Sequence, residues 1–151
     1  MLADLIITIL WSLSPLGEAK VGIPYGILNG IDKYVVFITC FLANALVFPL
    51  MLFFLERING YMLRWYSYKK AAIFVARRAK LASAKKIHKY GFWGLIFFVM
   101  IPLPGTGVYA GSIATYLFGI DRSNAFVANT IGLFLSSLII WSITVLSLKG
   151  A

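Results

Sequence analysis

Two parts of the chain repeat one pattern of residues at a constant offset. Gly30-Ile31-Asp32-Lys33 returns 89 residues later as Gly119-Ile120-Asp121-Arg122, and the same offset relates Gly22 to Gly111. In each copy a short apolar run meets a Pro/Gly turn, continues to the Gly-Ile-Asp sequence and enters a long apolar run. Interrupted apolar segments at corresponding positions are the best sequence pointer to a transporter's central site. We therefore predict two copies of one membrane unit.

The composition excludes an ordinary soluble protein. Hydrophobic residues make up 61% of the chain and charged residues only 13%, and the mean hydropathy is +0.89, so we predict a single integral membrane domain. Residues 34–55 and 124–148 are long enough to cross the bilayer, since 22 helical residues extend about 33 Å. Residues 2–13 and 92–101 form helices of only about 15–18 Å, which reach mid-bilayer.

These lengths predict an all-α integral membrane fold with an inverted repeat. Each half contains a re-entrant helical hairpin, at 2–30 or 91–119, followed by one transmembrane helix. Because each half crosses the bilayer once, the second half begins on the opposite side of the membrane from the first. The second half is therefore inverted relative to the first. Half 1 comprises residues 1–56 and half 2 residues 91–151. In the alternative model each hairpin is a kinked full span, which gives four crossings and both termini inside.

A basic segment joins the two halves. Of the 14 Lys and Arg residues, ten lie between Arg57 and Lys89. The positive-inside rule puts this helical loop, residues 57–90, in the cytoplasm of a cell whose plasma membrane the protein crosses several times. Contact with anionic headgroups is favoured over nucleic-acid binding. Both termini would then lie outside.

Glu18 is the sharpest candidate for a functional residue. An ionised carboxylate near the bilayer centre costs several kcal/mol, and intramembrane acids are usually functional. Desolvation would favour the protonated form, so Glu18 could load and release a proton. The alternative is a structural pair with Lys20. Lys20 also adds positive charge near two helix N-termini that follow the turns, which would favour a phosphate or carboxylate group.

Further residues define a predicted substrate path at the turns and inside the spans. Each has a simpler interpretation. The prolines and turn glycines would serve only to turn the chain, and the small residues would permit close helix packing. The two asparagines would hydrogen-bond across helices instead of lining a pathway. The path residues are Pro15, Gly17, Gly22, Pro24, Asn44, Pro102, Pro104, Gly105, Thr106, Gly107 and Asn129.

Other chemistry is not predicted. The lone Cys40 and the lone His88 do not supply a metal cluster, and the sequence contains no enzyme or cofactor motif. The expected partners are the lipid bilayer and a second copy of the chain, because two spans cannot surround two hairpins whose irregular backbone must be shielded from lipid. We therefore expect a homodimer or a higher homo-oligomer.

Two segments carry a resemblance to a known family. Glu18-Ala-Lys-Val-Gly-Ile-Pro-Tyr-Gly26 and Pro102-Leu-Pro-Gly-Thr-Gly-Val-Tyr-Ala-Gly111 resemble the signatures of the putative small multidrug export protein family. The resemblance covers nearly the whole chain. More distantly, the chain is similar to DedA or VTT-domain membrane proteins, which implies opposed re-entrant hairpins and the movement of lipid phosphates.

Three functions remain open at this point. The first is a proton- or ion-coupled secondary transporter that moves an anionic lipid or a small anion. The second is a small multidrug or cation exporter with Glu18 as counter-ion. The third is a passive lipid scramblase or membrane scaffold.

Overall fold

The computed structural model describes residues 2–102 and 106–150, without the side chains of residues 75, 78–90 and 149. These residues form helices joined by short turns, with no strand among them. The predicted all-helical class is confirmed. In chain order the elements are α1 (Leu2–Leu13), α2 (Glu18–Leu28), α3 (Lys33–Phe53), the π-helical segment η1 (Phe54–Ile58), α4 (Asn59–Met62), α5 (Tyr66–Met100), α6 (Val108–Phe118) and α7 (Arg122–Gly150).

Two helical stretches are long and apolar enough to cross a bilayer, judged by length and composition alone. They are Lys33–Met62, which begins with α3, and Arg122–Leu148 in α7. The two pack antiparallel, because Trp141 Nε1 donates a hydrogen bond to Lys33 O at 2.9 Å near one end and the Phe48 and Phe126 rings lie 5.9 Å apart near the other. The two predicted long apolar helices are therefore present.

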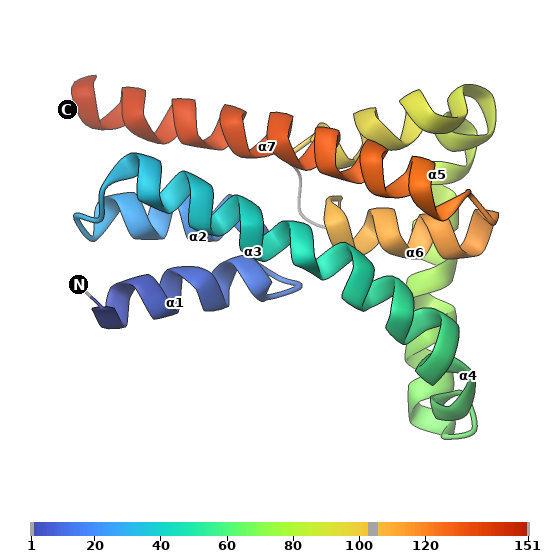
Figure 1. Ribbon diagram of the computed structural model, residues 1–151. Coiled ribbons are helices and arrows are strands. Elements are labelled where there is room, and N and C mark those ends of the chain that lie inside the picture. The colour runs from blue at the N-terminus through green and yellow to red at the C-terminus, as the bar shows by residue number, and fades with distance from the viewer. Residues whose placement is uncertain (1, 103–105, 151) are drawn as a thin grey trace.

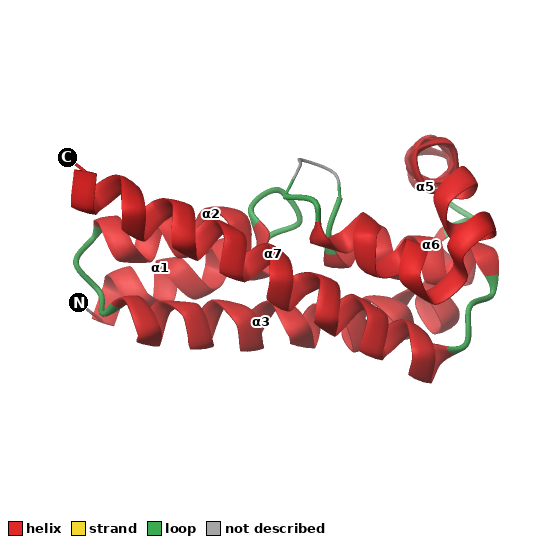
Figure 2. Ribbon diagram, turned by 90° about the horizontal axis from the view of Figure 1, so that it is seen from above, coloured by secondary structure: helices red, strands yellow, loops and turns green. Residues whose placement is uncertain are grey.

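Two shorter helix pairs lie at opposite ends of these long helices. The first pair is α1 and α2, which fold back on each other. The second pair is α6 and the Gly91–Met100 part of α5, which is set off from the earlier part of α5 by the positive φ of +50° at Gly91. The first pair lies at the end that carries both termini, and the start of α6 lies near the turn between α1 and α2, in the middle of the molecule (Figures 1 and 2).

The two Gly-Ile-Asp sequences adopt the same local structure. Gly30 and Gly119 have φ values of +78° and +62°. The amide of the isoleucine that follows donates to the carbonyl five residues earlier at 3.1 Å in both copies. Asp32 and Asp121 then accept hydrogen bonds from backbone N–H groups in the first turns of α3 and α7. Both aspartates act as N-caps, a role that Asp commonly has directly before a helix.

The repeat extends to side-chain packing. A Cβ atom on Gly22 would lie 3.3 Å from Cys40 Sγ, and one on Gly111 would collide with Asn129 Oδ1, at positions related by the same offset of 89 residues. The helix that follows each turn therefore uses a glycine to approach the long helix of its own half. Close packing is the role that the structure supports for Gly22, whose Cβ would also collide with Ser12 Oγ.

The basic segment runs across the end of the bundle. In Figure 1 the first part of α5 runs upward from α4, past the ends of α3 and α6, and in Figure 2 it is seen nearly end-on. Tyr68 Oη donates to Asn59 Oδ1 at 2.8 Å, which joins the start of α5 to α4. A helix in this position would lie along the headgroups if α3 and α7 cross the membrane.

Candidate functional site

Glu18 occupies a constrained position at the start of α2. The turn before it is closed by hydrogen bonds from the Gly17 and Glu18 amides to Ser14 O, at 3.2 and 2.9 Å. Glu18 has a φ of +52° and is 5% exposed. A non-glycine residue in this region of backbone space is uncommon, and the conformation persists only where the surroundings hold it. In this protein the residues around Glu18 stabilise that backbone conformation, and it places the carboxylate in the protein interior.

The Glu18 carboxylate points at the N-terminus of α6, in the other half of the chain. Its Oε1 accepts a hydrogen bond of 3.4 Å from Tyr109 N. Gly107, the residue before α6, packs so closely that a Cβ atom there would lie 2.8 Å from the carboxylate carbon and collide with Oε2. A carboxylate is favoured at this helix end because it meets unpaired N–H groups and the positive end of the helix dipole.

Lys20 and Tyr109 bind the two turns together reciprocally. Lys20 Nζ lies 3.3 Å from Glu18 Oε2 and also donates to Thr106 O in the turn of the second pair. Tyr109 Oη donates to Leu13 O in the turn of the first pair. The offset of 89 residues relates Lys20 to Tyr109, so equivalent positions reach across in opposite directions. We call Glu18, Lys20, Thr106, Gly107 and Tyr109 the hairpin clasp.

The charges within the clasp balance, which lowers the free-energy cost of burying them in an apolar interior. The ammonium and the carboxylate form a neutral pair, and hydrogen bonds to Thr106 O and from Tyr109 N satisfy further polar groups. Breaking such a pair would leave an uncompensated charge, which is far costlier than the intact pair. The sequence predicted both Glu18 and Lys20 as site residues, and the structure brings them together.

The remaining predicted turn residues differ in burial and in hydrogen bonding. Thr106 Oγ1 donates to Ile101 O at 2.6 Å and so holds its own turn. Pro15 is exposed and Gly17 is buried, whereas Pro24 and Pro102 are half-buried. Pro104 and Gly105 lie outside the described residues.

The two asparagines in the long helices are buried and incompletely satisfied. Asn129 Nδ2 donates to Ala125 O of its own helix at 2.9 Å, while its Oδ1 has no partner in the described part of the chain. Asn44 is fully buried, and within residues 2–102 and 106–150 neither its Oδ1 nor its Nδ2 has a partner. Among the described residues, neither asparagine side chain therefore hydrogen-bonds to another helix, which is one of the two roles considered for them.

Comparison with known proteins gives a family that spans both turns. The family described as putative small multi-drug export protein matches residues 18–139, from the first residue of the clasp to just past the middle of α7. The chain belongs to this family. No curated protein and no solved structure matched. With the apolar helices, membership in an export family makes the chain a helical membrane protein whose family is associated with transport.

Sequence reasoning missed two features of this small multi-drug export family member. One is Tyr109, which the repeat could have revealed as the counterpart of Lys20. The other is an ion pair between the halves: Arg122 Nη2 at the start of α7 lies 2.9 Å from Glu56 Oε2 in η1. Neither Glu56 nor Arg122 is among the predicted site residues.

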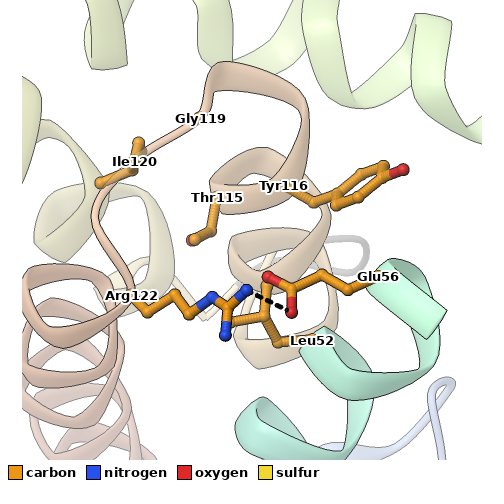
Figure 3. A pocket seen from close by; sticks show the side chains of 7 residues that line it. All are labelled: Leu52, Glu56, Thr115, Tyr116, Gly119, Ile120 and Arg122. Carbon is orange, nitrogen blue, oxygen red and sulfur yellow. Dashed lines mark ion pairs between the residues drawn. The ribbon is translucent and has the colours of Figure 1, made fainter.

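Two adjoining pockets of about 280 and 340 Å³ share this ion pair. Figure 3 shows the first, in which Arg122 and Glu56 face one another beneath Thr115 and the Gly119 turn. The second is lined mainly by apolar side chains, including Phe48, Pro49, Phe53 and Phe126. Because these pockets lie at the helix ends, they are separate from the clasp.

Proposed function

We propose that the protein is a secondary transporter in which two re-entrant hairpins meet at a binding site near the bilayer midplane. The observation that carries this proposal is the hairpin clasp, in which the Glu18 carboxylate from one hairpin sits on the α6 N-terminus of the other. Ionisable groups buried at such a depth are usually functional. A contact between two moving parts is also where a substrate site is built in many transporters.

The inverted arrangement is part of the proposal. Helix α1 has 12 residues and therefore extends about 18 Å, roughly half of the hydrocarbon core. Its turn back into α2 would leave the first hairpin on the side that it entered, and the second hairpin would enter from the other side. With the basic segment in the cytoplasm of a plasma-membrane protein, both termini would be outside.

An anion is the substrate class that the clasp supports best. Lys20 and the α6 N-terminus already hold an anionic group, the protein's own carboxylate. A phosphate or carboxylate group presents the same acceptor oxygens to the same donors. The substrate would be a small anion or the phosphate headgroup of an anionic lipid, bound when Glu18 leaves this position.

The test uses purified protein in lipid vesicles with an imposed pH gradient. Inorganic phosphate tests the free anion, and a labelled lipid phosphate tests the headgroup. Lys20→Ala should reduce anion flux at least tenfold, whereas the matched control Lys33→Ala, at the start of α3, should not. Retained flux of every anion after Lys20→Ala would contradict the proposal. Lipid flux that ignores both the pH gradient and Glu18→Gln would indicate a passive scramblase.

A second candidate is export of a lipophilic cation. The observation in its favour is that the Glu18 carboxylate holds an ammonium group, that of Lys20, which a cationic substrate could replace. Glu18→Gln should then abolish proton-coupled efflux of a fluorescent cation, and Lys20→Ala should preserve it. The two candidates therefore make opposite predictions for Lys20.

We further propose that a second copy of the chain covers the first turn. Pro15 is exposed and Leu16 is 91% exposed at this irregular backbone. Non-helical backbone is not tolerated against lipid. In a Cys40→Ala background, Leu16→Cys should form a crosslinked homodimer, whereas Ile38→Cys on the exposed face of α3 should not. A monomer mass for the purified protein would contradict this.

A further inference from the structure

The register of α2 against α3, continued from Gly26 and Gly22, leads to Glu18 on α2 and Asn44 on α3. Cβ atoms built on Gly26 and Gly22 meet Val36 and Cys40, at 2.8 and 3.3 Å. The helices are therefore antiparallel, and each step of four residues along one corresponds to four residues back along the other. The next step pairs Glu18 with Asn44, which continues the buried stripe of Val36 and Cys40 on α3. Asn44 is thus at the depth of the clasp.

The chemistry of an amide complements one protonation state of a carboxyl group. A protonated carboxyl has one O–H donor and a carbonyl acceptor, and a primary amide offers an acceptor and a donor in return. An ionised carboxylate only accepts, so it suits the N–H group of Tyr109 and the ammonium group of Lys20, which only donate. The described structure satisfies the second arrangement and leaves both polar atoms of Asn44 without a partner.

We propose that Asn44 is the second docking position of the Glu18 side chain, occupied when Glu18 is protonated. This inference rests on the proposed transport function and assigns its coupling step. A proton from the aqueous phase binds the Glu18 carboxylate, and the neutral carboxyl group turns from α6 to the amide of Asn44. The α6 N-terminus and Lys20 then receive a substrate anion. One proton and one anion enter together, so the net charge of the site is unchanged.

The charged groups around Glu18 are compatible with this exchange. Lys20 on α2 and the titratable Tyr109 on α6 face the carboxyl group, and the thiol of Cys40 lies one turn along α3 from Asn44. Charged residues in the sequences of the other helices packed here are at helix ends: Asp4 in α1, Lys33 in α3, and Arg122 and Lys149 in α7. The Gly91–Met100 part of α5 contains no charged residue.

The test measures access to the clasp without any substrate. In a Cys40→Ala background, Thr106→Cys is labelled with a small thiol reagent at a series of pH values. Because the thiolate fraction falls with pH, each labelling rate is divided by the rate of free cysteine with the same reagent at the same pH. We expect this ratio to rise at least fivefold as the pH is lowered through the titration of Glu18. Glu18→Gln mimics the neutral carboxyl and should give a high ratio at every pH. Asn44→Leu should abolish the acceleration and should slow labelling of the Glu18→Gln variant.

Controls separate this inference from a general effect on folding. Ser137→Ala removes another buried polar atom that has no partner among the described residues, but the antiparallel register puts it opposite the start of α3, so it should retain the acceleration. Asn44→Ala removes the same amide with less bulk and should behave like Asn44→Leu. Full acceleration in either Asn44 variant would overturn the inference. Acceleration that depends on Asn44 without any anion flux would instead overturn only the proposed function.

Discussion

Glu18 and Gly107 occupy equivalent positions of the internal repeat, and they are in contact. They are 89 residues apart in sequence, Glu18 is the first residue of α2 and Gly107 is the residue before α6, and both have a positive φ. The carboxylate of Glu18 fills the space that a side chain at position 107 would need. The repeat is therefore chemically asymmetric where its two copies meet: one copy supplies the acid and the other supplies room for it.

Gly107→Ala should separate the two turns. The φ of +129° strains a non-glycine residue by about 1–3 kcal/mol, and the added methyl group collides with Glu18, which overpacks the site by about 1–3 kcal/mol. We expect the free energy of unfolding to fall by about 3 kcal/mol, measured by thermal or denaturant unfolding in detergent. Gly60→Ala, which has open space around it, is the control and should change stability little. Equal effects at both positions would contradict the tight clasp.

Lys20→Met should destabilise the protein because it leaves the Glu18 carboxylate without its partner. Loss of one member of a buried pair costs about 3–5 kcal/mol, and we expect the lower end because the Lys20 side chain is 16% exposed. Adding Glu18→Gln should restore most of that stability. The coupling is measured by a double-mutant cycle. If the losses of the two single variants simply add, the pair is not a structural unit.

Asn44→Leu should raise stability at neutral pH while it impairs coupling. A buried polar group without a partner costs about 1–3 kcal/mol, and leucine has a similar size. For a chain of this length, 1 kcal/mol shifts the melting temperature by about 2–4 °C, so an increase of a few degrees is expected in detergent. Ser137→Ala should give a smaller increase. A fall in melting temperature would show that Asn44 has a partner in the resting protein.

Arg122→Gln should change stability by less than about 1 kcal/mol. The ion pair with Glu56 is short, but the Arg122 side chain is 75% exposed, and exposed pairs contribute about 0–1 kcal/mol. The small loss should disappear near 1 M salt, where screening is nearly complete. A large, salt-independent loss would indicate that this pair is shielded in the assembled protein.

Tags at Met1 and Ala151 should be accessible from outside intact cells. This follows from a cytoplasmic basic segment and one full crossing in each half. Accessibility is measured with a membrane-impermeant protease or antibody, and a tag inserted at Gly60 serves as the protected control. Two protected termini would favour four full crossings over re-entrant hairpins.

Local patterns made much of this architecture predictable. The apolar lengths indicate the two long helices, and the Gly-Ile-Asp sequences predict the N-caps of α3 and α7. Glu18 and Lys20 could also be predicted as site residues, because an acid and a base between apolar runs stand out in the sequence. The pockets at Glu56 and Arg122 could not be predicted, because they arise from two segments more than sixty residues apart.

The sequence alone determined the helical class, the two long apolar helices and the residues that could carry charge in an apolar surrounding, because these depend on composition and short-range spacing. Only the tertiary structure decided what those residues meet. It brings the Glu18 carboxylate to the α6 N-terminus, joins Lys20 to Thr106 O, and leaves the amide of Asn44 without a partner. The physical reason is that contacts between halves depend on how the packed helices align, and no local pattern encodes that alignment.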